Sequence, residues 1–141
     1  MVIETINVLQ KKCIRLINFS PFNCHTISLF AENHILKLED SITANKLKLA
    51  LDFKTNNIPS DLMNMFTYSS DVHSHNTRNA TNHGFHVPRV CSTNFGINTL
   101  KYSVPITWNK FILTNPQICN FNHPFQLKSF LNKLFISQYK L

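Results

Sequence analysis

The stretch VIETINVLQKKCIRLI, residues 2–17, decides the fold class of this chain. Its apolar residues recur at intervals of three and four positions, which is the period of an amphipathic α-helix. These positions are Ile3, Ile6, Leu9, Cys13, Leu16 and Ile17. The basic residues Lys11, Lys12 and Arg15 fall in its C-terminal half, where they suit the helix dipole as solvated side chains and are equally suited to hold phosphate.

Two further helices are expected in the first half of the chain, over residues 26–32 and 41–53. Asp40 stands immediately before the longer helix, at the position where an N-cap carboxylate accepts backbone N–H groups. The side chains expected on the buried face of that helix are Ile42, Leu49 and Phe53. A short helical turn is expected over residues 60–65.

The last third of the chain predicts two more helices. Over residues 97–112, three apolar residues lie four positions apart, namely Leu100, Val104 and Trp108. Pro105 must then fall early in this helix or kink it. Pro124 occupies a permitted first-turn position of the closing helix. The apolar stripe of that helix consists of Leu127, Phe130, Leu131, Leu134 and Phe135.

Between these helical regions the periodicity disappears, and Ser, Thr, Asn and His predominate, which is a loop composition. At 141 residues the chain has the length of one domain. We therefore expect a mainly α, small single domain of amphipathic helices with at most a short β-hairpin. It comprises a helical half (1–66), an irregular His- and Arg-rich segment (67–96) and C-terminal helices (97–141).

Composition narrows the function classes. The net charge of +7 favours a polyanionic partner. Two glycines are too few for a glycine-rich phosphate loop, and the seven acids form no cluster that a two-metal polymerase or nuclease requires. We expect no enzyme activity, cofactor or small-molecule substrate. Without an apolar run of roughly 18–20 residues or a secretory signal, an intracellular protein of the cytoplasm or nucleus is expected, with no membrane partner.

The segment VHSHNTRNATNHGFHVPRV, residues 72–90, contains four of the seven histidines, and Cys91 follows it. A zinc site here would use His73, His75, His83, His86 and Cys91. However, the paired ligand spacing of structural zinc sites is missing. In the alternative interpretation, Arg78, Arg89 and Lys101 bind phosphate. Phe85, Tyr102 and the nearby His75 and His86 then either stack on bases or serve structure.

An ordered series of short motifs resembles the C-terminal region of reverse transcriptases from LINE-type, non-long-terminal-repeat retrotransposons of the jockey-like groups. The motifs are LQKKCIRLI (9–17), SPFNCHTISLF (20–30), LKLEDS (36–41), IPSDL (58–62), HNTRNA (75–80), VPRV (87–90) and TNFGINTLKYSVPITWN (93–109). The residues that match the family pattern are Thr77, Arg78, Pro88, Arg89, Thr93, Gly96, Tyr102, Pro105, Trp108 and Asn109. The Leu-Pro pair that commonly follows Trp-Asn is replaced by Lys110-Phe111-Ile112.

The resemblance implies a non-catalytic extension beyond the polymerase core that helps to hold template RNA or target DNA. In this setting Trp108 and Tyr102 are expected to anchor the core. The residues expected to bind nucleic acid are Lys11, Lys12, Arg15, His75, Arg78, Arg89 and Lys101. Two alternatives stay open: a zinc-stabilised interaction domain that uses the histidines, and a degenerate open reading frame with no present function.

Overall fold

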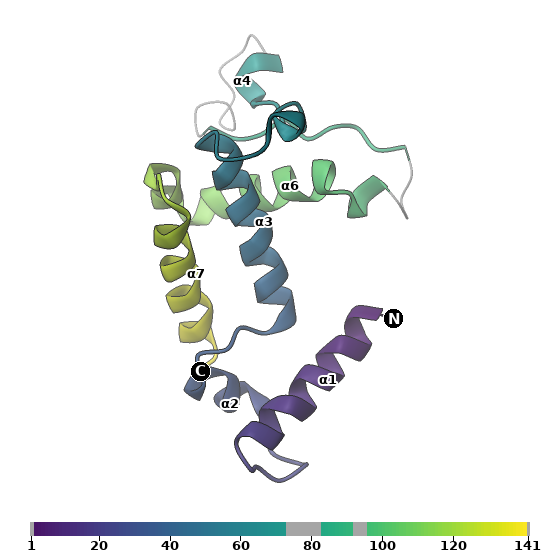
Figure 1. The fold of residues 1–141 in the computed structure, drawn as a ribbon, viewed down its shortest axis with the longest axis vertical. Coiled ribbons are helices and arrows are strands. Elements are labelled where there is room, and N and C mark those ends of the chain that lie inside the picture. Colours follow the sequence, from purple (N-terminus) through teal and green to yellow (C-terminus); the bar gives the residue numbers. More distant parts are fainter. Residues whose placement is uncertain (1, 73–82, 92–95, 141) are drawn as a thin grey trace. The chain divides into compact units, whose positions relative to one another are not determined.

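The structure is a computed structural model that describes residues 2–72, 83–91 and 96–140, and helices dominate it (Figure 1). The helices are α1 (Val2–Ile17), α2 (Thr26–Glu32), α3 (Leu38–Lys54), α4 (Ser69–Val72), α6 (Leu100–Thr114) and α7 (Pro124–Gln138). Short 3-10 helices lie at Ser60–Leu62, Gly96–Asn98 and Pro116–Asn120. Within the described ranges, β pairing is confined to a bridge between Tyr68 and Phe85. The predicted mainly α fold is confirmed.

The helix predictions succeed where the apolar period is local. The bounds of α1 and α2 agree with the predicted ranges, and α7 begins at Pro124 as expected. The expected N-cap at Asp40 is wrong, because α3 begins two residues earlier and places Asp40 inside its first turn. There the Asp40 carboxylate accepts a hydrogen bond from the Tyr139 hydroxyl.

The buried faces of the helices differ in part from expectation. In α3 the core residues are Leu47, Ala50, Leu51 and Phe53, whereas Ile42 and Leu49 are only half-buried. In α6 the predicted Pro105 lies in the second turn with its ring buried. Proline has no N–H to donate to the carbonyl of Lys101, so this turn lacks one helical hydrogen bond.

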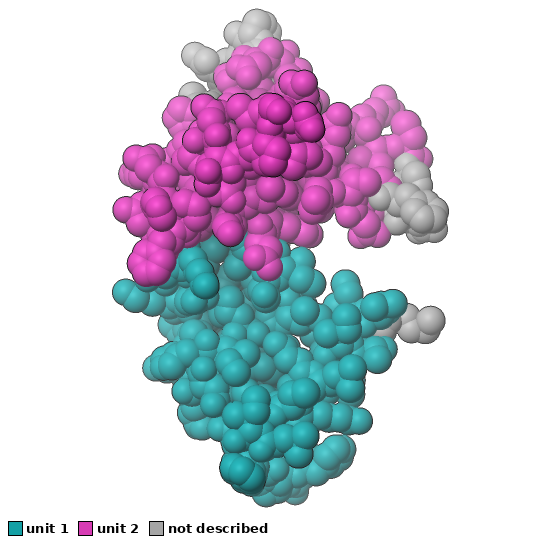
Figure 2. Space-filling model, viewed as in Figure 1, with its two compact units in different colours: residues 1–44, 128–141 teal, residues 45–127 magenta. Residues whose placement is uncertain are grey.

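Two compact units are distinguished along the chain (Figure 2). Unit 1 comprises residues 1–44 and 128–141, and unit 2 comprises residues 45–127. Helices α3 and α7 each contribute residues to both units. The expected organisation of 1–141 as one domain, with divisions after residues 66 and 96, stays a prediction.

Unit 2 is built around aromatic rings. The ring of Phe85 is the centre of the cluster, with its centroid between 5.2 and 5.9 Å from those of four neighbours. The neighbours are Phe53, Phe66, Tyr68 and Trp108. The side chain of Asn109 fixes the backbone of Phe85: its Oδ1 accepts the Phe85 N–H at 2.8 Å, and its Nδ2 donates to the Phe85 carbonyl at 2.7 Å. The backbone N–H and the carbonyl of the buried residue Phe85 are thereby both hydrogen-bonded.

Unit 1 is held together by apolar side chains of α2 and α7 and by Tyr139. The Tyr139 hydroxyl accepts the backbone N–H of Lys37 at 3.1 Å and donates to Asp40. Helix α1 packs against α2 but buries only Ile14. The apolar stripe that predicted α1 therefore lies exposed, with Leu16 and Ile17 facing solvent.

None of the helices in the described ranges has both the length and the apolar character needed to cross a bilayer.

Candidate nucleic-acid interface

A pocket of about 510 Å³ in unit 1 gathers basic side chains, and we call it the basic pocket. It lies among the C-terminal half of α1, the loop of residues 18–25, the start of α2 and the segment before α3. Its ionisable lining residues are Lys11, Arg15, His25, Lys37, Glu39 and Cys24. Three basic side chains, those of Lys11, Arg15 and Lys37, thus share the pocket with one carboxylate, that of Glu39. The pocket is therefore suited to an anion.

Arg15 is held in place by the loop that follows its own helix. Its Nε donates to the carbonyl of Cys24 at 3.1 Å, and its guanidinium carbon lies 5.6 Å from the centroid of the Phe22 ring. These two contacts use one donor and one face of the guanidinium. The terminal amino groups, which form the fork that binds phosphate, are the donors that remain for a ligand.

Lys11 lies one helical turn before Arg15, and both side chains line the basic pocket. Lys12 is exposed on the same helix but is not among the lining residues. The structure thus brings together two of the three basic residues that the sequence assigned on α1. Neighbouring residues of a helix point about 100° apart, which explains why Lys12 faces elsewhere.

Lys37 and His25 complete the basic pocket, and sequence reasoning did not find them. Gln10 of α1 donates to the Leu36 carbonyl at 2.9 Å and accepts the Leu38 N–H at 3.0 Å, which fixes the segment that carries Lys37. The ammonium of Lys37 lies 4.3 Å from the centroid of the Tyr139 ring, a cation–π contact. These pairings join residues far apart in sequence, so no local pattern indicates them.

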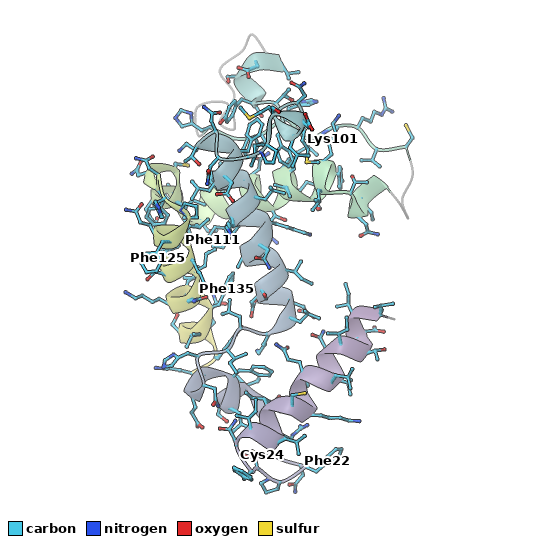
Figure 3. The ribbon with its side chains drawn as sticks, viewed as in Figure 1. Phe22, Cys24, Lys101, Phe111, Phe125 and Phe135 are labelled. Carbon is cyan, nitrogen blue, oxygen red and sulfur yellow. The ribbon has the colours of Figure 1, made fainter. Side chains whose placement is uncertain are left out.

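A second, smaller group of polar residues lies in unit 2. Lys101, at the start of α6, lines a pocket of about 190 Å³ together with His86 and Pro88 (Lys101 is labelled in Figure 3). Arg89 follows Pro88 and is exposed. The sequence-predicted Lys101 and the interleaved His86 are therefore neighbours.

Two of the predicted nucleic-acid contacts, His75 and Arg78, lie outside the described residues, as does His73 of the zinc hypothesis. Of the other proposed zinc ligands, His83, His86 and Cys91 lie within the described ranges. No group of three or more His, Cys, Asp or Glu side chains in those ranges is arranged to hold a metal ion. Because part of the ligand set is not described, the zinc site as a whole stays untested.

Several residues of the motifs in segment 93–109 have structural roles. Trp108 is fully buried, as expected of a core anchor, and Tyr102 is half-buried. Asn109 fixes the backbone of Phe85. A Cβ atom at Gly96 would lie 1.7 Å from Cγ1 of Val90, so a larger residue there would force the Val90 side chain to shift. The Trp-Asn and Thr-x-x-Gly motifs thus contain residues that unit 2 needs for packing.

The buried position of Phe85 decides between two interpretations of that residue. Its side chain is only 1% exposed, so it belongs to the core and is not a base-stacking ring. The basic pocket in unit 1 gathers Lys11, Arg15 and Lys37, and it is therefore the site that we consider for a polyanion. The chain matches no protein-family model, and neither a curated protein nor a solved structure is similar to it.

Proposed function

We propose that this chain is a non-catalytic module that binds RNA or DNA through phosphate groups, and that it is the C-terminal region of a LINE-type retrotransposon reverse transcriptase. The observation that carries the proposal is the basic pocket, where Lys11, Arg15 and Lys37 face the single acid Glu39. A cluster of basic side chains is the electrostatic footprint of a nucleic-acid-binding protein.

The chemistry of these cations supports phosphate as the ligand. Arg15 is already oriented by Cys24 and Phe22, so little side-chain freedom remains to be lost on binding. The Glu39 carboxylate accepts the Asn7 side-chain amide at 3.3 Å. Arg15 contacts a carbonyl and an aromatic ring, and Lys37 contacts an aromatic ring. Because these groups carry no formal charge, an anionic ligand can still neutralise the two cations.

Two further features agree with the proposal. The net charge of +7 gives long-range attraction to a polyanion. In unit 2, Lys101 and Arg89 are exposed and supply additional phosphate contacts. A nucleic-acid partner would place the protein in the cytoplasm or the nucleus. The proposed relationship to retrotransposon reverse transcriptases rests on the ordered motifs of the sequence.

The test is a salt titration of binding to fluorescently labelled RNA and DNA. We expect log affinity to fall linearly with log salt, with a slope of about −0.7 for each phosphate contacted in a single strand. The variant Lys11→Gln plus Lys37→Gln removes two cations from the basic pocket. It is expected to bind about tenfold more weakly, with a slope about 1.4 units shallower.

The matched control is Lys133→Gln, which removes an exposed cation of α7 that does not line the basic pocket. Its affinity is expected to stay within about twofold of the parent chain. If neither RNA nor DNA binds at about 50 mM salt, or if affinity does not depend on salt, the proposed function is wrong. If Lys133→Gln weakens binding as much as the pocket variant, the assigned site is wrong.

A further inference from the structure

The loop of residues 18–25, part of which lines the basic pocket, exposes two aromatic rings. Phe19 is 97% exposed and Phe22 is 80% exposed, the two highest values among the large apolar side chains of the described residues. Figure 3 shows Phe22 and Cys24 on the loop that joins α1 and α2. Large aromatic side chains normally bury most of their surface. These two rings bury little, so they contribute little to the stability of the fold.

The backbone of Phe19 has a conformation that rarely carries an aromatic side chain. Its φ of 50° is in the left-handed region, where glycine is the usual residue. The Phe19 N–H donates to the Leu16 carbonyl at 3.2 Å, and the Ser20 N–H donates to the Arg15 carbonyl at 2.9 Å. This is the Schellman end of a helix with phenylalanine at the glycine position. The ring is thereby turned away from the helix into solvent.

The second ring, Phe22, is tied directly to the basic pocket. Its face lies under the guanidinium of Arg15, and the next residues of the loop, Asn23 and Cys24, line the pocket. Cations that hold a phosphate backbone next to exposed rings are the arrangement by which proteins bind single strands, because every unpaired base has a face available for stacking.

We propose that Phe19 and Phe22 stack on unpaired bases while the basic pocket holds the adjoining phosphates, so that the ligand is single-stranded nucleic acid. The inference rests on the proposed function and specifies its substrate. In a duplex the base faces are already stacked, so these two rings add affinity for single strands only. The chain therefore prefers a single strand over a duplex of the same sequence.

The experiment compares binding of an oligonucleotide of about 20 bases, as a single strand and as a duplex, to the parent chain and to Phe19→Ala plus Phe22→Ala. The double variant is expected to lose at least about tenfold in single-strand affinity. Its duplex affinity should fall by no more than about fivefold, because a duplex loses only the contact by which Phe22 orients Arg15. The matched control is Phe125→Ala, which removes another exposed ring, 72% exposed, that does not line the basic pocket. It is expected to leave both affinities unchanged.

Phe22→Trp supplies a second readout. It keeps a stacking ring, so single-strand affinity is retained, and the indole fluorescence is quenched by a stacked base. Trp108, the one other tryptophan, is fully buried and serves as a constant background.

The outcomes separate this inference from the proposed function. Equal losses for single strand and duplex, or an unquenched indole at saturation, overturn the stacking role while nucleic-acid binding stands. Absence of binding to either form overturns the proposed function itself. If the double variant binds both nucleic acids like the parent but loses binding to phosphatidylserine vesicles, the rings serve a lipid surface and the inference is wrong.

Discussion

Two phenylalanines, one in each unit of this protein, have opposite roles. In unit 2, Phe85 is 1% exposed at the centre of an aromatic cluster, while in unit 1 Phe19 is 97% exposed at the end of a helix. The side-chain amide of Asn109 fixes the backbone of Phe85 inside the cluster, whereas main-chain hydrogen bonds at the end of α1 turn Phe19 outward. The difference teaches that the backbone partners of an aromatic residue, rather than its apolar character, decide whether it builds a core or a surface.

The largest expected effect comes from removing the ring at the centre of the cluster. Phe85→Ala deletes contacts with four aromatic neighbours and leaves a cavity, so unfolding should become easier by about 3–5 kcal/mol. Urea unfolding followed by the fluorescence of Trp108 measures the loss in unit 2.

Phe19→Ala is the counterpart on the exposed side of the comparison. Since its ring contributes little buried surface, unfolding free energy should change by less than about 0.5 kcal/mol. A loss of similar size in both variants would contradict the division between core and surface rings.

A smaller loss of stability than that of Phe85→Ala is expected when Asn109, which fixes the backbone of Phe85, is replaced. Asn109→Ala leaves the N–H and the carbonyl of a buried peptide without their side-chain partner, which costs about 2–3 kcal/mol. Asn109→Asp keeps the oxygen that accepts the N–H and loses the donor to the carbonyl. This variant should therefore also be destabilised. If urea unfolding gives both variants the same free energy of unfolding as the parent chain, the two hydrogen bonds from Asn109 do not stabilise Phe85.

Among the buried residues, the smallest destabilisation is expected at Tyr139, whose hydroxyl is hydrogen-bonded to both Lys37 and Asp40. Burial and the hydrogen bond to Asp40 raise the pKa of Tyr139 above its ordinary value of 10.0. A raised folded-state pKa means that the hydroxyl contributes fully below pH 10 and that its contribution is lost as the pH rises above 10. Tyr139→Phe should cost about 1–1.5 kcal/mol at neutral pH.

The measurement compares parent and Tyr139→Phe stability at neutral pH and above pH 10, together with hydrogen exchange of the Lys37 amide that bonds the hydroxyl. The difference between the two chains should shrink at high pH, because the parent loses its advantage there. Tyr68, whose pKa burial also raises, is present in both chains and cancels from the difference. A difference that grows with pH would contradict the assigned sign.

The sequence could predict the helices because their signals are local. The apolar period of residues 2–17 determined α1, and Pro124 marked the start of α7. It could not predict that the stripe of α1 is exposed, since periodicity identifies an apolar face but not what covers it. Asp40 was misplaced for a related reason: its partner, Tyr139, lies 99 residues away.

The candidate site was predictable only in part. Lys11 and Arg15 share one side of α1, and charge and spacing were enough to select them. Lys37 joins them through the hydrogen bonds of Gln10 to another segment, which no sequence period records. The rings expected near bases were sought in the segment around Phe85, whereas the displayed rings lie in the loop of residues 18–25.

The division of unit 1 between the two ends of the sequence has a consequence for synthesis on the ribosome. Unit 2 is one continuous stretch, so all of its residues are available once residue 127 has emerged. Unit 1 needs Tyr139 to bond Lys37 and Asp40, so its first 44 residues must wait until residue 139 has left the exit tunnel. During that interval Leu29 and Phe30 of α2, which the finished unit buries, are open to chaperones that bind exposed apolar segments.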